Sequence, residues 1–199
     1  MSPQLSPSEE STVSQRSSVA ASAGLGVFAA AIGYLLTYLL VASEVREAVG
    51  DNVAEWKAVA WFFYEAHMVG VEVSGQIGSF AGMSTLDLIA QSDTASATLL
   101  YVVPPVVLFA AGALLAVRWD VSDLGEAVVV GAPVTIGYAV VMGLGALATE
   151  STTETSALGI EASSSIAPAL LPAIVLGGVL YPLVFATAGA AIAAAVATR

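Results

Sequence analysis

The sequence of 199 residues contains no cysteine, and this absence excludes several kinds of chemistry at once. Without a thiol the chain can form no disulfide, no thiolate metal site and no cysteine nucleophile, so its redox compartment cannot be inferred. Basic residues are also few, because five Lys and Arg stand against 16 Asp and Glu and the net charge is −11. A phosphate backbone needs a basic surface, and we therefore expect no nucleic-acid partner.

Charge of either sign is scarce, since 11% of residues are charged and 57% are hydrophobic. Four long segments contain no charged residue, and each reaches the roughly 20 residues that a membrane-spanning helix needs. The predicted spans are residues 19–42, 98–117, 127–148 and 172–196. We therefore predict an all-α integral membrane four-helix bundle, in which residues 19–199 form a single transmembrane domain that lies in the lipid bilayer. Residues 1–18 are polar and Ser-rich and are predicted to form a disordered cytoplasmic tail.

A long outer loop, residues 43–97, follows the first span and is predicted to carry amphipathic or interfacial helices. Within it, residues 58–71 read AVAWFFYEAHMVGV, an apolar and aromatic block that is short for a span. This length is typical of an interfacial or re-entrant helix, while a fifth span is the main alternative. A fifth span would place Glu65 and His67 in the bilayer, which is costly for charged groups.

The basic residues near the ends of the spans predict the orientation of the chain. With four spans, Arg16, Arg118 and Arg199 all fall on one side, and positive charge near short loops marks the cytoplasmic side. Arg46 and Lys57 fall on the other side, in a loop long enough that their charge has less influence on orientation. We therefore expect a multi-pass protein of the cell membrane with both termini in the cytoplasm and the 43–97 loop outside.

A few residues are candidates for a functional site, although none forms a recognised catalytic motif. His67 is the single histidine, and Glu65 lies two residues before it on a different side of a helix. Glu126 is predicted at the cytoplasmic start of the third span, where it can cap the helix or pair with Arg118. Pro104 and Pro105 are predicted to kink the second span, because each removes a backbone donor.

These candidates do not indicate an enzyme, a metal site or a bound cofactor, and none of the three is expected. A metal site would need oxygen ligands besides His67, and a lone histidine is more often structural than catalytic.

The acidic Ser-rich tail, four Ala-, Val- and Gly-rich spans and the block WFFYEAHMVGV together resemble small membrane proteins of haloarchaea whose function is uncharacterised. The resemblance covers most of the chain, and WFFYEAH is its distinctive part. It implies a membrane setting in high salt and carries over no activity and no site residue.

Two functions remain open at this point. In the first, the protein is a non-catalytic membrane component that associates with itself or with another membrane protein through small-residue faces of its helices. In the second, it is a small transporter or permease subunit whose proline-kinked helices frame a substrate path. The absence of charge inside the spans favours the first function, because ion and proton pathways usually include ionisable residues.

Overall fold

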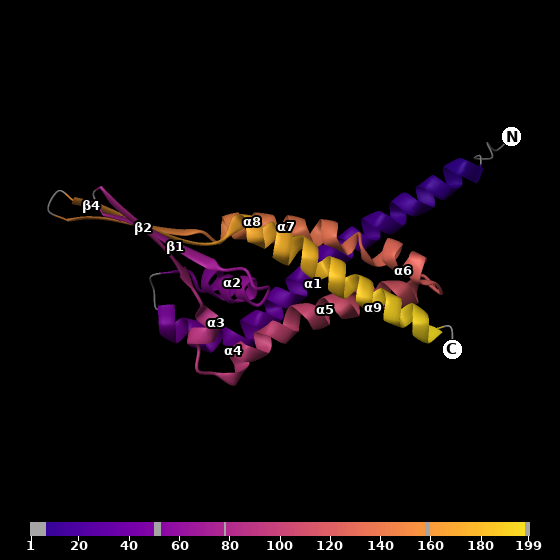
Figure 1. The fold of residues 1–199 in the computed structure, drawn as a ribbon, viewed down its shortest axis with the longest axis horizontal. Coiled ribbons are helices and arrows are strands. Elements are labelled where there is room, and N and C mark those ends of the chain that lie inside the picture. The colour runs from indigo at the N-terminus through magenta and orange to yellow at the C-terminus, as the bar shows by residue number, and fades with distance from the viewer. Residues whose placement is uncertain (1–6, 50–52, 78, 158–159, 198–199) are drawn as a thin grey trace.

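Helical segments running side by side form the body of the protein, in a computed structural model that describes residues 7–49, 53–77, 79–157 and 160–197 (Figure 1). In chain order these segments are α1 (Pro7–Val49), α4 (Ala95–Leu99) with a 3-10 turn (Leu100–Val102) and α5 (Val103–Arg118), α6 (Leu124–Gly131) and α7 (Val134–Ala148), and α8 (Leu170–Pro172) with a π-helix (Ala173–Leu180) and α9 (Tyr181–Ala197).

Four of these helical stretches are long and apolar enough to cross a membrane, as the sequence predicts. They cover Ser18–Glu47, Ala95–Arg118, Leu124–Ala148 and Leu170–Ala197. Helix α1 begins at Pro7, so residues 7–18 of the expected tail belong to this helix, and residues 1–6 lie outside the described residues. We refer to these four stretches together as the bundle.

A four-stranded antiparallel sheet projects from one end of the bundle, and the prediction of an all-α fold is therefore wrong. Its strands are β1 (Val71–Ile77), β2 (Phe80–Leu86), β3 (Ser151–Ala157) and β4 (Ile160–Pro168). They lie in the order β2-β1-β4-β3, so two hairpins that are distant in sequence join through β1 and β4. We call the end of the bundle from which this sheet extends the sheet end, and the sheet itself the arm.

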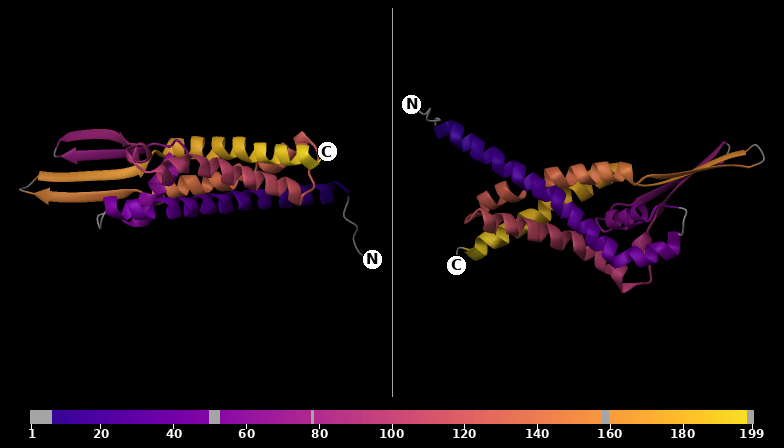
Figure 2. Two further views of the ribbon diagram at one scale, coloured as in Figure 1. Left: turned by 90° about the horizontal axis from the view of Figure 1, so that it is seen from below. Right: turned by 180° about the vertical axis from the view of Figure 1, so that it is seen from behind.

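The arm continues roughly along the direction of the helices, away from the place where α1 begins and α9 ends (Figure 2). One of its hairpins follows the first span and the other connects the third span to the fourth. Each hairpin leaves two residues between its paired strands, since Ile77 pairs with Phe80 and Ala157 pairs with Ile160. Two-residue connections are typical of antiparallel hairpins, and each one sets the register of the two strands that it joins.

The predicted outer loop contains more structure than interfacial helices. Helix α1 extends through its start to Val49, and α2 (Glu55–Glu65) follows after residues 50–52, which lie outside the described residues. The first hairpin comes next, and then the short helix α3 (Leu88–Gln91), which leads into α4. Most of the block 58–71 is the buried part of α2, a helix of 11 residues that is shorter than a span.

Glycine allows the helices of the bundle to approach until their backbones touch. A Cβ atom added to Gly112 of α5 would lie 1.8 Å from the carbonyl oxygen of Ala186 in α9. One added to Gly137 of α7 would lie 1.9 Å from the carbonyl oxygen of Ala23 in α1. Such contacts replace large side chains as the means of packing, as is usual where lipid removes the hydrophobic drive between helices.

Candidate functional site

Helix α2 is enclosed by other parts of the chain on every side. Each of its residues from Ala58 to Glu65 is buried, whereas a helix on a surface buries only one face. It packs against α1, and the second core cluster joins its side chains to those of α1, β1 and α4. The helix therefore enters the bundle from the sheet end and occupies space between the spanning helices.

Hydrogen bonds to α7 and the residues after it show how far α2 enters. The Lys57 ammonium donates to the carbonyl of Glu150, and the Trp61 indole donates to the carbonyl of Thr149 over 3.1 Å. Deeper in the bundle, the Tyr64 hydroxyl donates to the carbonyl of Met142 over 2.7 Å. The contacts thus move from the end of α7 toward its start as α2 proceeds, so α2 runs antiparallel to α7.

The chain reverses direction at the deep end of α2. Met68 has a φ of 58°, in the left-handed region, and the amide of Val69 donates back to the carbonyl of Tyr64 over 3.1 Å. This pattern ends a helix by satisfying its last carbonyl groups. Strand β1 then carries the chain out to the arm, so α2 and β1 enter and leave through the same end of the bundle.

His67 lies at this deepest point and is fully buried. Its Nδ1 is 2.7 Å from the carbonyl oxygen of Phe63, which can only accept, so Nδ1 carries the proton. Its Nε2 is then an acceptor, and the Tyr138 hydroxyl donates to it over 2.7 Å. Tyr138 precedes the end of α7 by ten residues, which places His67 about 15 Å along α7 from the sheet end.

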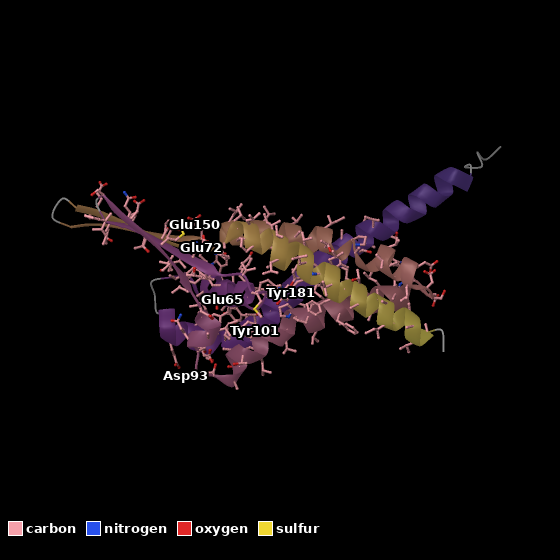
Figure 3. All side chains as sticks on the ribbon, in the orientation of Figure 1. Glu65, Glu72, Asp93, Tyr101, Glu150 and Tyr181 are labelled. Carbon is pink, nitrogen blue, oxygen red and sulfur yellow. The ribbon has the colours of Figure 1, made fainter. Side chains whose placement is uncertain are left out.

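Aromatic rings and a glycine complete the surroundings of His67. The ring of Phe63 lies 4.7 Å away and that of Tyr181 lies 5.1 Å away, measured between centroids, and Figure 3 shows Tyr181 among the helices. Gly177 of the π-helix leaves room for this cluster, since an added Cβ would lie 3.5 Å from Cβ of His67 and 2.5 Å from Cε of Met142. The π-helix therefore brings its backbone against the buried histidine, and π-helical turns often occur at such special positions.

Burial lowers the pKa of His67 to about 4, because removing the ring from water penalises its charged form. The hydrogen bond to Phe63 opposes this shift and has the smaller effect. His67 is thus a neutral imidazole near pH 7 that joins the end of α2 to α7. This arrangement can hold a helix in place, and no carboxylate of the described residues forms an ion pair with the ring.

Glu65 faces a different part of the protein from His67. Its two carboxylate oxygens accept hydrogen bonds from the backbone amides of Leu88 and Ile89, over 3.0 and 2.9 Å. Burial raises the pKa of Glu65, while these two bonds favour its charged form. Glu65 therefore holds the start of α3 against α2 (Figure 3), a role that a two-residue spacing from His67 does not indicate.

The other candidates predicted from the sequence lie outside the His67 cluster. Glu126 is in the first turn of α6 at the end of the bundle opposite the arm, where Asp123 provides the helix cap by accepting from the Glu126 amide over 3.0 Å. Among the described residues the one ion pair joins Arg46 to Glu55, so Glu126 does not pair with Arg118. Pro104 and Pro105 lie in the first turn of α5, directly after the 3-10 turn, where a missing amide costs little.

Ionisable groups do not gather into a metal site in the part of the chain that the structure describes, where no three His, Asp or Glu residues are placed to hold an ion. Glu72 lies on the arm and is exposed, and it does not join His67 and Glu65 (Figure 3).

The arm is a second candidate site because its two faces differ in chemistry. Residues paired across strands share a face, and alternate residues of one strand point to opposite faces. One face, which we call the apolar face, has no charged residue among its members. These are Val71, Val73, Gly75, Ile77, Phe80, Gly82, Ser84, Leu86, Ser151, Thr153, Thr155, Ala162, Ser164, Ile166 and Pro168.

The opposite face, which we call the acidic face, carries all three carboxylates of the strands. Glu72, Glu154 and Glu161 point to this side, among Ser, Thr, Gln and Ala residues and the exposed Met83. At the base of the arm, the Ser165 hydroxyl donates to the carboxylate of Glu150 over 2.8 Å. The arm is thus amphipathic in the manner of a sheet that covers a core, with water expected on one side only.

The apolar face is covered near the bundle and exposed farther out. Val71, Leu86 and Ile166 pack into the second core cluster with α2. Toward the tip, Ile77 is 63% exposed and Phe80 is 81% exposed. Apolar surface of this kind is unusual on a sheet that faces water, and it indicates a surface used for contact.

Comparison with known proteins identifies a family and nothing further. No curated protein and no solved structure matches the chain. Residues 1–197 match the family described as "Family of unknown function (DUF7978)". This match covers nearly the whole chain, so the protein belongs to the DUF7978 family.

Proposed function

We propose that this protein is a multi-pass component of the cell membrane that acts without catalysis, by binding another protein chain through its arm. The observation that carries the proposal is the apolar face, whose outer part is exposed while the same face is core nearer the bundle. A sheet with an apolar face normally buries it against a second layer. No second layer from the described residues covers this part, so a separate chain is the layer we propose.

The helices of the bundle support this choice of surface. Helix association through small residues was the expected mode, but the bundle uses many of its glycines internally. Gly26, Gly112, Gly137 and Gly189 each meet a neighbouring backbone of the same chain. These glycines are therefore already used within the chain, and the arm is the surface that we propose for association.

The proposed orientation puts both termini in the cytoplasm and the arm outside. It is supported by the position of Arg118 at the end opposite the arm, together with the placement of all three strand carboxylates on the arm. The cysteine-free chain allows a direct test with single cysteines at positions 16, 74, 121, 156 and 199, of which 74 and 156 lie on the exposed acidic face of the arm. We expect an impermeant maleimide to label positions 74 and 156 from outside intact cells and to leave the others unlabelled. The reverse pattern would contradict the orientation.

Association through the arm can be tested with a photo-crosslinking amino acid placed on either face of β2. Phe80 and Met83 are suitable because both are large and highly exposed, at 81% and 75%, and they point to opposite faces. We expect a crosslink to a protein chain from position 80 in native membranes and little from position 83. Equal crosslinking from both positions, or none from position 80, would contradict the proposal.

A small transporter is a second candidate, favoured by the buried α2 and the π-helix against which His67 lies. Irregular backbone at this depth is found where it is enclosed by protein or lines a path. Pro104 and Pro105 lie within the Ala95–Arg118 stretch, directly after the 3-10 turn that interrupts it. Purified protein in liposomes that carries no ion or small-solute flux would exclude it, whereas flux that His67→Ala abolishes would favour it over association.

A further inference from the structure

We infer that the protein binds a monovalent metal cation, Na⁺ or K⁺, at the break between α6 and α7, which solvent reaches through a cleft at the end of the bundle opposite the arm. The inference goes beyond the proposed function, because it uses neither face of the arm. It is argued from the backbone at the break, from one buried hydroxyl group and from the residues that line the cleft.

A proline interrupts the hydrogen bonds between α6 and α7. The Val129 carbonyl would accept from the amide of residue 133, but that residue is Pro133 and has no amide hydrogen. The Gly131 carbonyl would accept from Thr135, whose amide donates to Ala132 over 3.1 Å instead. Two carbonyl groups at the end of α6 therefore lack the bonds that a continuous helix would give them.

The Thr135 side chain is affected by the same break. Its hydroxyl oxygen is buried and has no hydrogen-bond partner among the described residues. In a continuous helix this hydroxyl could donate to the carbonyl four residues earlier, which here belongs to Gly131. Four other hydroxyls of the bundle make such a bond, namely Ser22 to Ser18, Thr37 to Gly33, Thr149 to Gly145 and Thr187 to Leu183. A buried oxygen without a partner indicates a place where water or an ion is bound.

Neighbouring helices close the break on two sides. A Cβ atom added to Gly26 of α1 would lie 2.1 Å from the Val134 carbonyl oxygen, and one added to Gly131 would lie 3.0 Å from the Ala186 carbonyl oxygen in α9. The break lies about 12 Å from the start of α6, measured along that helix. A carbonyl group at this depth is costly to leave unpaired unless water or an ion reaches it.

A cleft of about 800 Å³ gives water and ions access to α6. It is lined by Ser18 of α1, by Trp119 after α5 and by Glu126, Val129 and Val130 of α6, among others. The last three residues are three and four positions apart, so they share one face of the helix. Glu126 is exposed, and no ion pair of the described residues includes it. The cleft therefore carries a free carboxylate one turn before the residue whose carbonyl lost its partner at Pro133.

The chemistry of these groups selects a cation with a single charge. Carbonyl and carboxylate oxygens accept hydrogen bonds or coordinate cations, and the carbonyl end of a helix carries partial negative charge. Glu126 adds one full negative charge in a chain whose net charge is −11. Divalent ions are usually held by several carboxylates, whereas one carboxylate with neutral carbonyl and hydroxyl oxygens suits Na⁺ or K⁺. Freed carbonyls at the ends of interrupted helices coordinate Na⁺ in other membrane proteins.

Thermal unfolding of the full-length protein in detergent tests the site. The midpoint is measured over the same series of concentrations of NaCl, KCl and N-methylglucamine chloride, so that surface charge is screened equally. At a concentration about ten times the Kd, we expect Na⁺ or K⁺ to raise the midpoint by about 4 °C above its value in N-methylglucamine. Equal midpoints in the three salts at every concentration would overturn the inference.

Two variants remove groups of the site, and two matched variants do not. Glu126→Gln removes the charge and Thr135→Val removes the hydroxyl with little change of shape, and we expect each to reduce the cation-specific rise at least about threefold. Asp120→Asn removes an exposed carboxylate at the same end of the bundle, and Thr187→Val removes a hydroxyl that already donates to Leu183. Both of these should keep the rise. Persistence of the rise in either Glu126→Gln or Thr135→Val, or its loss in the matched variants, would overturn the inference.

The same data separate a bound ion from a bound water molecule. Water between Thr135 and Gly131 would give the wild type the same midpoint in all three salts, and Thr135→Val would lower that midpoint equally in each. This result would overturn the cation site. It would leave the proposed function standing, because crosslinking from position 80 depends on the arm alone.

Discussion

The bundle and the arm use small residues for opposite purposes. In the bundle, Gly112 and Gly137 lie where another helix of the same chain presses against the backbone. In the arm, an added Cβ on Gly82 would meet nothing within 4 Å, and one on Gly75 would meet a single atom at 3.9 Å. The first region is closed by its own chain, whereas the outer part of the second is open on both faces. The comparison teaches that composition alone does not distinguish a packed surface from a free one.

The largest expected effect comes from breaking the closed region. Gly112→Ala would place its methyl group against the Ala186 carbonyl, so α5 and α9 must separate. We expect a loss of about 3 kcal/mol in the free energy of unfolding, at the upper end for overpacking. Unfolding in detergent, followed by circular dichroism, measures this loss. Gly24→Ala is the matched control, because nothing lies within 4 Å of that position in α1. A similar loss in both variants would contradict close packing as the cause.

The next effect concerns the deepest hydrogen bond. Tyr138→Phe removes the hydroxyl that donates to His67 and leaves a buried nitrogen without its donor. We expect the free energy of unfolding to fall by about 2 kcal/mol. Tyr38→Phe is a suitable comparison, because its hydroxyl bonds to Glu55 at a partly exposed site. An equal loss in the free energy of unfolding of the Tyr38→Phe variant would contradict a larger contribution from the buried hydrogen bond to His67.

The same bond gives stability a dependence on pH. The pKa of His67 is about 4 in the folded protein and near 6.5 in an unfolded chain. As the pH falls from 6.5 toward 4, the unfolded chain binds a proton at His67 that the folded protein does not bind. The free energy of unfolding therefore falls across that window. His67→Gln removes the titrating group. We expect its stability to fall less than that of the wild type over the same range, and parallel curves would contradict a buried neutral His67.

A smaller effect is expected where the bundle meets the arm. Glu65→Gln replaces one of the oxygens that accept from the Leu88 and Ile89 amides with an NH₂ group that cannot accept. We expect a loss of about 1 kcal/mol, concentrated in α3. Hydrogen exchange of a peptide that contains residues 88–91 should quicken relative to one from α5. Glu72→Gln, on the exposed acidic face, should leave both peptides unchanged.

The smallest effect is expected on the arm. Phe80→Ser removes a large side chain that is 81% exposed, and we expect the free energy of unfolding of the monomer in detergent to change by less than about 0.5 kcal/mol. A loss above about 1 kcal/mol would mean that the side chain packs within its own chain. The arm would then be packed by its own chain, as the bundle is.

Features that depend on local composition could be predicted from the sequence. The four uncharged runs correspond to the four apolar helices within a few residues, because a span is recognised from its length and hydropathy alone. The strands carried a signal that is easily missed. Val71, Val73 and Ile77 alternate with Glu72 and Gln76, yet the intervening Gly and Ser residues weaken the pattern.

Features that depend on contacts between distant residues could not be predicted. The pairing of β1 with β4 joins residues about 90 positions apart, and no local pattern specifies it. The contact between His67 and Tyr138 also joins residues that are distant in the chain, so neither the partner of His67 nor its neutral state could be predicted from the sequence. Glu65 was proposed as a site residue because it is charged in an apolar block. Its role as an acceptor for the start of α3 required the fold.

The pairing of β1 with β4 also constrains how the protein is made. Residues 71–77 leave the ribosome long before residues 160–168, and the second and third apolar helices lie between them in the chain. The first hairpin therefore keeps an open β1 edge until both of those helices and the second hairpin have been synthesised. A chain truncated before residue 160 would lack the strand that pairs with this edge, so its sheet would stay incomplete.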